Sequence, residues 1–406
     1  MEQVLYDLPK GWEWKTLGDV CLKVTDGSHN PPKGVEAGLP MLSSRNVMDN
    51  GLVWDNFRLI PEDAFKNEHK RTRISEGDVL LTIVGTIGRS CVVRDLDKLF
   101  TLQRSVAVLS TEELVPEFLS YQFKAPFIQE HFVNNAKGSA QKGIYLKQLK
   151  ATNLVCPPKE QQKRIVEKLD ALLNRIDTAI EHLQESVTLK NSLLQSALDG
   201  QFSAITDRMT IESLAEVKGG KRLPKGEKLS DEETEHPYIR VADFTDRGTI
   251  DLSGIKYVSK EIHKQIKRYV ISKDDLYISI AGTIGKTGFV PPELDGANLT
   301  ENAAKLVIRD KQQLDLSYLY LFTLTSDFSA QAGLATKTVA QPKLALTRLS
   351  KIEIPMCSLE EQKSLVSTIE ALKSKIHDAE AVLLGKIEDL KSLKASILDS
   401  AFKGEL

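Results

Sequence analysis

Two short strings in the chain have the order of catalytic or phosphate-binding motifs. Residues 30–33, Asn-Pro-Pro-Lys, follow the Asn-Pro-Pro-aromatic tetrad with which amino-group DNA methyltransferases stack a flipped base, but Lys33 replaces the aromatic ring. Residues 282–287, Gly-Thr-Ile-Gly-Lys-Thr, end like a phosphate-binding loop, yet Ile280 stands where the first glycine of that loop belongs. We therefore expect no catalytic residues, and we interpret the second string as a tight turn between two strands with Lys286 at its edge.

The cysteines and histidines do not form a metal-binding pattern. Cys21, Cys91, Cys156 and Cys357 include no close pair, and the seven histidines lack the spacing of metal ligands. The sequence therefore predicts reduced thiols, no metal site and no cofactor.

Several cations lie in Gly-rich stretches that read as loops. Residues 137–143 and 218–226 combine lysines or arginines with glycines, so that backbone donors and long cationic side chains are free to meet phosphate groups. The alternative, solvated turns with ordinary surface lysines, stays open for either loop. The net charge of −2 gives no general basic character that would favour nucleic acid.

Much of the sequence occurs twice. Gly282 lies 197 positions after Gly85 (282 − 85), and each glycine begins a Gly-Thr-Ile-Gly string. A second set of matches, which includes Gln162 and Gln362, has a spacing of 200 (362 − 162). A repeat this long is a duplicated domain rather than a solenoid unit, and a chain of 406 residues is long enough for two hydrophobic cores.

Each half ends in a long helical pattern. After short β-like runs such as 79–84 and 106–109, Pro157-Pro158 ends the irregular part and apolar residues then recur every three or four positions. About 40 residues at 1.5 Å each would make rods of roughly 60 Å. A narrow seam along so long a rod needs one partner, and we expect the two helices to pair with each other as an antiparallel coiled coil. Packing of each helix on its own domain or on another protein is the alternative. The expected seam residues are Ile165, Leu169, Leu172, Ile176, Ile180, Leu183, Val187, Leu365, Ile369, Leu372, Ile376, Leu383, Ile387 and Leu390.

These patterns predict an α+β fold with an internal pseudo-two-fold repeat. We expect similar β-rich domains over residues 1–156 and 204–356, and long helices over 157–203 and 357–406. Because Ser358 follows no proline pair, we expect the second helix to start in a less tightly fixed way than the first. The chain has no run of 18 apolar residues and no signal-peptide pattern, so we expect a cytoplasmic protein without a membrane segment.

Motifs along the whole chain resemble those of one family. They are residues 26–33 with 39–47, residues 219–226 with 237–244, the two Gly-Thr-Ile-Gly turns, the Pro-Pro-Lys-Glu-Gln-Gln start of the first helix, and the closing residues 398–406. In this order, and duplicated, they resemble the DNA-specificity subunit of Type I restriction-modification systems.

The resemblance implies a non-catalytic subunit with two target recognition domains, each reading one half of a split site in double-stranded DNA. It also implies that the helices set the spacing of the half-sites and dock two adenine methyltransferase subunits. Whether restriction or translocase subunits join the complex is left open. An interaction scaffold whose domains bind proteins, with the coiled coil as spacer, is the competing hypothesis, while a self-contained methyltransferase or nuclease lacks the motifs that it would need.

For a DNA reader, side-chain chemistry limits the candidates. Arg and Lys suit guanine, Asn and Gln suit adenine, and Ser and Thr serve bases and phosphates alike. Matched positions of the two halves differ, since Arg104 corresponds to Glu301, so the site is expected to be bipartite and not palindromic. A structural role in a turn or cap is the alternative for each candidate. The candidates are Ser28, His29, Asn30, Ser44, Arg45, Asn46, Thr86, Arg89, Gln103, Arg104, Ser139, Gln141 and Lys142 in the first half, and Lys221, Arg222, Arg240, Asp243, Thr283, Lys286, Asn302, Lys337, Thr338, Gln341 and Lys343 in the second.

Overall fold

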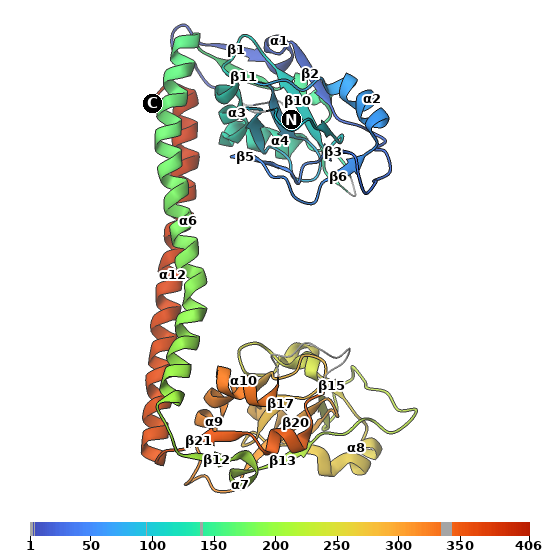
Figure 1. Ribbon diagram of the computed structural model, residues 1–406, viewed down its shortest axis with the longest axis vertical. Coiled ribbons are helices and arrows are strands. Elements are labelled where there is room, and N and C mark those ends of the chain that lie inside the picture. Colours follow the sequence, from blue (N-terminus) through green and yellow to red (C-terminus); the bar gives the residue numbers. More distant parts are fainter. Residues whose placement is uncertain (1–2, 4, 95, 139–140, 334–342) are drawn as a thin grey trace. The chain divides into compact units, whose positions relative to one another are not determined.

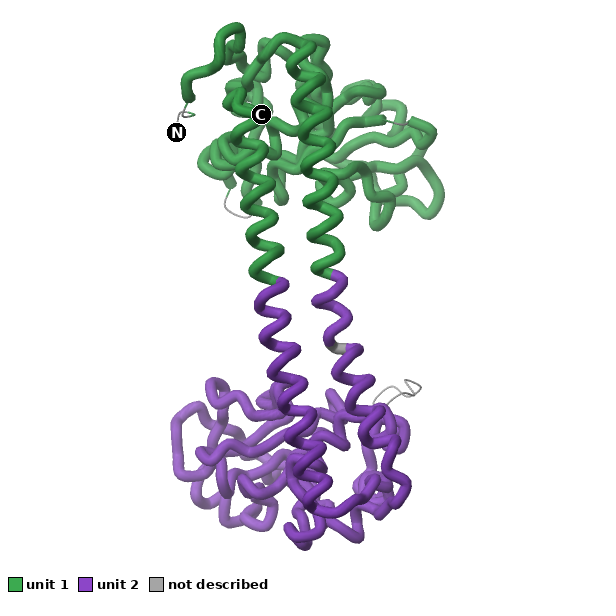
Figure 2. The backbone as a smooth tube through the Cα atoms, turned by 90° about the vertical axis from the view of Figure 1, so that its left-hand side faces the viewer, with its two compact units in different colours: residues 1–184, 384–406 green, residues 185–383 purple. Residues whose placement is uncertain are grey.

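In the computed structural model, which describes residues 3, 5–94, 96–138, 141–333 and 343–406, the chain divides into two compact units. Unit 1 comprises residues 1–184 and 384–406, and unit 2 comprises residues 185–383 (Figure 2). Each unit contains one globular α+β domain and a segment of each of two long helices. Within the described part of the chain, no helix is both long and apolar enough to cross a bilayer.

The domain of unit 1 is built on a four-stranded antiparallel sheet and a three-stranded sheet (Figure 1). The runs predicted as strands, 79–84 and 106–109, are confirmed as the two central strands of the larger sheet. The larger sheet has the order β2 (Lys23–Asp26), β10 (Val106–Ser110), β7 (Val79–Thr82) and β8 (Ser90–Val92). The smaller has the order β6 (Arg58–Ile60), β3 (Leu39–Leu42) and β9 (Thr101–Leu102), and short pairs join β1 (Glu13–Thr16) to β11 (Asn153–Cys156) and β4 (Val47–Met48) to β5 (Gly51–Leu52).

The domain of unit 2 repeats the strand order of the larger sheet, but its smaller sheet has four strands where that of unit 1 has three. In both domains the smaller sheet contains one parallel pair, β3 with β9 in unit 1 and β14 with β19 in unit 2. The larger sheet of unit 2 has the order β13 (Ala215–Gly219), β20 (Ala303–Ile308), β17 (Leu276–Ser279) and β18 (Thr287–Phe289). The smaller has the order β15 (Lys256–Tyr257), β14 (Pro237–Ile239), β19 (Ala297–Leu299) and β16 (Val270–Ile271), and β12 (Arg208–Thr210) pairs with β21 (Glu353–Pro355).

Short helices cover the sheets and connect them to the long helices. In unit 1, Phe118 and Phe123 of α3 join one buried cluster with Phe402 near the end of the chain. In unit 2, Tyr318 and Phe322 of α9 enclose Phe202 in the same way. The α-helices are α1 (Leu17–Val20), α2 (Glu62–Thr72), α3 (Pro116–Lys124), α4 (Pro126–Asn135) and α5 (Leu146–Lys150) in unit 1, and α7 (Ile211–Leu214), α8 (Lys260–Ile266), α9 (Leu316–Thr323), α10 (Ser326–Ala332) and α11 (Leu346–Ser350) in unit 2. Single 3-10 turns of unit 2 are Val241–Asp243, Leu252–Gly254, Lys267–Tyr269 and Pro292–Leu294.

The two long helices are α6 (Lys159–Ser203) and α12 (Leu359–Lys403), each of 45 residues. In unit 1 the early part of α6 contacts the late part of α12, where Lys394 Nζ lies 2.6 Å from a carboxylate oxygen of Asp177. In unit 2 the late part of α6 contacts the early part of α12 through an ion pair between Lys190 and Glu380. The helices therefore pair antiparallel, which confirms the expected fold class.

The seam between the helices follows the predicted spacing except at one position. Leu172 is 37% exposed, whereas the neighbouring Leu173 is only 2% exposed and packs in the core of unit 1. Residues that follow one another at steps of three and four lie on the same face of a helix and can all contact the partner helix. From Leu169, steps of four, three and four reach Leu173, Ile176 and Ile180. The prediction for Leu172 was wrong because two adjacent leucines give the same apolar signal in a sequence.

Charged residues also occupy the seam, which the sequence analysis missed. Lys190 and Glu380 are each about one-quarter exposed, at 26% and 25%, and Lys394 is 28% exposed. All three fall on the three- and four-residue steps of the stripe, where the apolar pattern is interrupted. A polar residue at such a position fixes the register of paired helices at some cost in stability.

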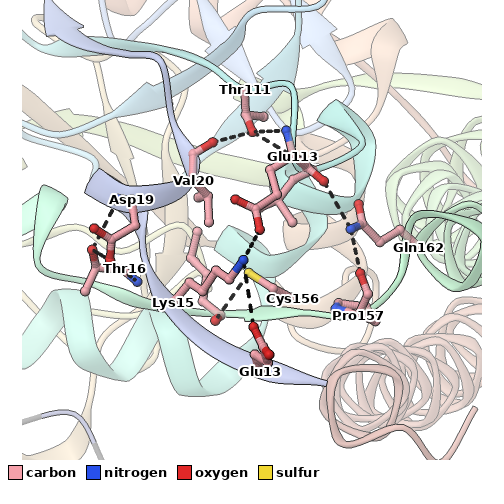
Figure 3. A network of polar contacts seen from close by, with 12 residues as sticks. Glu13, Lys15, Thr16, Asp19, Val20, Thr111, Glu113, Cys156, Pro157 and Gln162 are labelled. Carbon is pink, nitrogen blue, oxygen red and sulfur yellow. Dashed lines mark hydrogen bonds and ion pairs between the residues drawn. The ribbon is translucent and has the colours of Figure 1, made fainter. Parts of the chain in front are cut away.

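A buried glutamine joins the first helix to its domain. The side chain of Gln162, 1% exposed, accepts a hydrogen bond from Val115 N (2.7 Å) and donates to Pro157 O (2.8 Å) and Glu113 O (3.4 Å) (Figure 3). On the other side of Glu113, its carboxylate pairs with Lys15 of β1. The start of α6 is thus fixed to the loop before α3 and to the end of β11, which sets the direction of the helix relative to the sheet of unit 1.

Gln362 makes the corresponding joint in unit 2. Its side chain accepts from Asp315 N (2.9 Å) and donates to Gln313 O (2.9 Å) and Cys357 O (3.0 Å). The second helix start also has a capping box, because Ser358 N donates to the Glu361 carboxylate and Glu361 N donates to Ser358 Oγ. The second helix start is thus fixed by a cap in place of the proline pair, and the expectation that it is less tightly fixed than the first stays a prediction.

Candidate nucleic-acid interface

In unit 1, loops from five parts of the sequence lie side by side at one edge of the larger sheet. Ser28 forms a parallel bridge with Gln103, and Gln103 N donates to Leu42 O (2.8 Å). Ser44 N donates to Ser105 Oγ (3.0 Å), and Gly85 N donates to Lys142 O (3.1 Å). The loops around residues 28, 44, 85, 103 and 142 therefore form one surface, which we call the unit 1 edge.

A glycine lets two of these loops approach closely. Gly27 N donates to Val106 O, and a Cβ atom on Gly27 would collide with the carbonyl oxygen of Leu102. Gly220 has the same place in unit 2, since its N donates to Ala303 O and an added Cβ would collide with Thr300 O. The backbone of each edge thus depends on the absence of a side chain at this position.

Most residues of unit 1 that were predicted to contact DNA are exposed at this edge. Arg104 is exposed, and the structure gives its guanidinium no hydrogen bond to another described residue, while its backbone N donates to Ser28 O (2.9 Å). Exposed arginine and amide side chains on a rigid backbone can donate to base edges and phosphates. The exposed predicted residues are His29, Asn30, Arg45, Thr86, Arg104, Gln141 and Lys142, and the partly exposed ones are Ser44, Arg89 and Gln103.

His29 is held in place by a charged pair. Its Nε2 lies 2.8 Å from Asp26 Oδ2 and 3.2 Å from Arg71 Nη2, and Arg71 also pairs with Asp26. Asp26 is 6% exposed, whereas the His29 side chain is 52% exposed. The imidazole is thus presented at the unit 1 edge from a buried carboxylate, and sequence analysis did not find Asp26 or Arg71.

Three residues of unit 1 that were predicted to contact DNA instead support the backbone of the edge loops. Asn46 is fully buried, and its side chain accepts from Ser43 N (3.0 Å) and donates to Asp55 O (2.8 Å). Arg89 is partly buried and donates to Ser44 O (2.8 Å), and Ser28 is 3% exposed. For Asn46 and Ser28 a base contact is corrected to a structural role, because Asn46 has no access to solvent and Ser28 has almost none.

The turn that carries Arg89 is the tight connection expected between two strands. In unit 1 it joins β7 to β8 with φ of +81° at Gly85, and in unit 2 it joins β17 to β18 with φ of +78° at Gly282. A phosphate-binding loop leads into a helix, whereas here a strand follows. Lys286, at the corresponding place to Arg89, lies 2.7 Å from Asp246 and 3.4 Å from Phe244 O, so it also holds the frame.

The same loops meet in unit 2 and form a unit 2 edge. Lys221 N donates to Leu299 O (2.8 Å), just as Ser28 N donates to Leu102 O (2.8 Å) in unit 1. Ile280 N donates to Asn302 O (2.8 Å), and Leu344 N donates to Ile280 O (2.9 Å). The predicted residues exposed at this edge are Lys221, Arg222, Thr283, Asn302 and Lys343.

Arg240 and Asp243 bind each other, and Asp243 is buried while Arg240 is partly exposed. Asp243 is 4% exposed and accepts from Arg240 N (2.7 Å), which repeats the Asn46 contact with Ser43 N at the matched position. The Arg240 guanidinium pairs with the same carboxylate and donates to Gly254 O (2.7 Å). The prediction that Asp243 contacts bases is therefore corrected to a capping role.

Arg222 forms an exposed charged contact at the unit 2 edge. Its Nε lies 2.6 Å from Glu301 Oε1, and the Arg222 side chain is 79% exposed while that of Glu301 is 26% exposed. Burial opposes ionisation of Glu301, but hydrogen bonds from Arg222, from its own backbone and from Thr300 lower its pKa below the ordinary value. Glu301 is thus a carboxylate at neutral pH, and sequence analysis did not identify it as a reader.

Four predicted residues, Ser139, Lys337, Thr338 and Gln341, lie outside the described residues. Among the residues that are described, no group of three or more His, Cys, Asp or Glu side chains is placed to hold a metal ion.

The profile of the Type I restriction modification DNA specificity domain matches the chain twice, over residues 9–190 and 206–388. The StySPI specificity subunit of Salmonella potsdam is 22% identical over 98% of this chain and 90% of its own length. The EcoBI specificity subunit of Escherichia coli is 27% identical over 67% of this chain, and that match spans 62% of the relative.

Two solved structures share the fold. An HsdS subunit from Thermoanaerobacter tengcongensis matches all of both chains with a TM-score of 0.58 and 23% identity. A chain from a structure on complex assembly of the type I R-M system matches 99% of this chain and 100% of its own length with a TM-score of 0.76 and 21% identity. The match of the family profile to both halves assigns the chain, which carries the domain in duplicate, to the Type I restriction modification DNA specificity family.

Proposed function

We propose that the chain is the specificity subunit of a Type I restriction-modification complex, in which the unit 1 edge and the unit 2 edge each bind one half of a split site in double-stranded DNA. The observation that carries the proposal is the repetition of one edge in two units of a chain of this family. In each unit the same backbone hydrogen bonds bring the same loops together, and exposed Arg, Lys, Asn, Gln and Thr side chains stand on them. Such side chains can donate hydrogen bonds to the acceptor atoms of DNA bases and phosphates.

The side chains of the two edges support an asymmetric target. Matched backbone positions carry His29 and Arg222, and also Arg104 and Glu301. Arg104 has a guanidinium that can donate to DNA, whereas Glu301 at the matched position is a carboxylate that binds Arg222, so the two edges present different hydrogen-bonding groups. We therefore expect the half-sites to differ. The remaining contacts of the proposed interface are assigned to the other exposed or partly exposed predicted residues, together with the predicted residues outside the described segments.

We further propose that α6 and α12 set the gap between the half-sites. Their buried joints at Gln162 and Gln362 hold each domain firmly on a helix, which supports this role. Seven residues inserted at matched places of both helices would add about 10 Å while preserving the seam, or about three base pairs of duplex. A folded variant whose methylated sites keep the original gap would contradict this role.

The helices are also the proposed docking surface for two adenine methyltransferase subunits. Leu189, Leu193 and Val382 of unit 2 are 58%, 57% and 57% exposed, and Leu384 and Leu393 of unit 1 are 50% and 49% exposed. Large apolar side chains this exposed on a helix pair that already has a filled seam are available to a partner protein. Whether restriction subunits complete the assembly is a separate question.

Methylation mapping tests the proposed function. A host lacking other methylation systems would carry this chain with its partner adenine methyltransferase, and its adenine methylation would be read across the genome. We expect a bipartite, non-palindromic motif that is lost when this chain is deleted and the methyltransferase is kept. A motif that persists without this chain would overturn the proposal.

A further inference from the structure

The unit 2 edge presents one arginine on an unusually complete support. The backbone of the Lys221–Arg222 loop is held by the Lys221 N bond to Leu299 O (2.8 Å) and by the Tyr238 hydroxyl, which donates to Lys221 O (2.8 Å). Tyr238 is 3% exposed, so this support comes from the core of the domain. The loop therefore cannot shift without disturbing buried contacts.

The Arg222 side chain is fixed by Glu301, and Glu301 is itself fixed. Glu301 Oε1 accepts from Arg222 Nε at 2.6 Å, and Glu301 Oε2 accepts from the Thr300 hydroxyl at 3.0 Å. Thr300 is 6% exposed and its N donates to Ile239 O. A chain of contacts thus leads from β14 and β19 to the inner nitrogen of the guanidinium.

The outer half of the guanidinium is left for a ligand. The contact to Glu301 uses Nε, and the structure gives the two terminal nitrogens of Arg222 no hydrogen bond to any residue that it describes. Two parallel N–H donors of a fixed guanidinium match the O6 and N7 acceptors of guanine in the major groove. A phosphate could accept from the same pair, but the negative charge of Glu301 beside the guanidinium repels a phosphate and does not repel a neutral base, so the carboxylate favours a base as the ligand.

We propose that Arg222 reads a guanine in the half-site bound by unit 2 and that Glu301 is a positioning residue that aims its terminal nitrogens at that base. The inference rests on the proposed function and names one of its base contacts. Pre-organisation by Glu301 removes much of the rotamer freedom that a free arginine would lose on binding.

Unit 1 shows the contrast that makes the pair informative. His29 stands at the position of Arg222 and is held by Asp26 from below, while Arg104 stands at the position of Glu301. The Arg–Glu pair is therefore a property of the unit 2 edge. It predicts a guanine in the half-site bound by unit 2 and makes no prediction for the half-site bound by unit 1.

The test compares three variants in the complex of this chain with its methyltransferase. Arg222→Ala should lose preference for guanine at one position of one half-site by about 10- to 100-fold, with the other positions retained. Glu301→Gln should reduce the same preference by a smaller factor. Arg309→Ala is the matched control, because Arg309 forms another Arg–Glu pair of unit 2, with Glu216 (3.2 Å), at the opposite end of β20.

Modified duplexes separate base reading from other roles. In binding and methylation assays, 7-deazaguanine at the implicated position should weaken the wild-type complex and leave the Arg222→Ala complex unaffected, since N7 is the acceptor removed. Equal weakening of both complexes, a uniform loss across all positions, or an unchanged preference in Glu301→Gln would each overturn the proposal. The wild-type bipartite motif is the independent check on the proposed function, because its absence would reject that function before any variant is compared.

Discussion

Gln162 in unit 1 and Gln362 in unit 2 make the same three hydrogen bonds, whereas Arg104 and Glu301, which also occupy matched positions, carry opposite charges. The glutamines are 1% and 0% exposed, and losing a partner there would leave a buried backbone group without a hydrogen bond. Arg104 and Glu301 lie at the edge, where a changed side chain costs the fold little. The two copies of the domain thus share the buried hydrogen bonds that attach each long helix and differ in the exposed side chains of their edges.

The largest effect is expected from exchanging a whole edge. Replacing residues 1–156 by the corresponding domain of another family member should change one half-site of the methylation motif completely. The half-site of unit 2 should stay as it is, because its edge lies within residues 204–356. Methylation mapping of the exchanged protein measures both halves at once, and loss of both would show that the edges do not act separately.

A substitution of the buried glutamine that joins a long helix to its domain should have the next largest effect. Gln162→Leu leaves Val115 N and Pro157 O without a partner and should lower the free energy of unfolding by about 3 kcal/mol. The three tryptophans, Trp12, Trp14 and Trp54, all belong to unit 1, so tryptophan fluorescence in a denaturant series follows that unit.

Gln362→Leu is the matched control for the joint. We expect it to leave the fluorescence midpoint nearly unchanged while circular dichroism shows early loss of helix. Equal shifts of the fluorescence midpoint in the two variants would mean that the joints are not local to their units.

The ion pairs in the seam should give smaller effects. Lys190→Met leaves Glu380, 25% exposed, without its partner and should cost about 1 kcal/mol, and Lys394→Met should cost less because Asp177 is 46% exposed. The double variant Lys190→Met with Glu380→Leu should recover the loss, since it places apolar side chains in an apolar seam. Chemical denaturation followed by circular dichroism measures all three, and a double variant as unstable as Lys190→Met would contradict this account.

The smallest difference concerns the thiols. Burial raises the pKa of Cys91 and of Cys156 to about 12, so both remain protonated thiols at pH 8 and should resist alkylation in the folded protein. Cys357 of unit 2 is only partly buried, and burial raises its pKa as well. Mass spectrometry after brief iodoacetamide treatment at pH 8 should therefore find Cys357 modified before the two buried thiols, and the reverse order would show that the core of unit 1 opens first.

The strands around residues 79–84 and 106–109 and both long helices could be predicted from the sequence because they depend on local spacing, and the repeat could be predicted because the two halves share motifs in the same order. The sequence did not separate the residues that are exposed at the edges from those that support the backbone of the edge loops. Asn46 and Asp243 lie in polar loops like their exposed neighbours, and only the fold shows that their side chains turn inward to cap a backbone N–H. The same limit hid Glu301, whose partner Arg222 is 79 positions away in the chain.

The Lys190–Glu380 contact was missed for a related reason. A seam is recognised from its apolar members, and a charged residue on the same stripe reads as part of the solvated face until its partner is known. Leu172 and Leu173 show the opposite case, in which two apolar neighbours compete for one place and three-dimensional packing selects one of them.

Gly27 and Gly220 bear on any attempt to retarget the protein. At both positions an added methyl group would meet a backbone carbonyl of the neighbouring strand connection, which cannot move aside as a flexible side chain could. A combinatorial library could therefore randomise residues 29, 45, 104, 222 and 301 freely, provided that it leaves these two glycines untouched. New specificities would then arise on an unaltered scaffold, and inactive clones would report on chemistry rather than on misfolding.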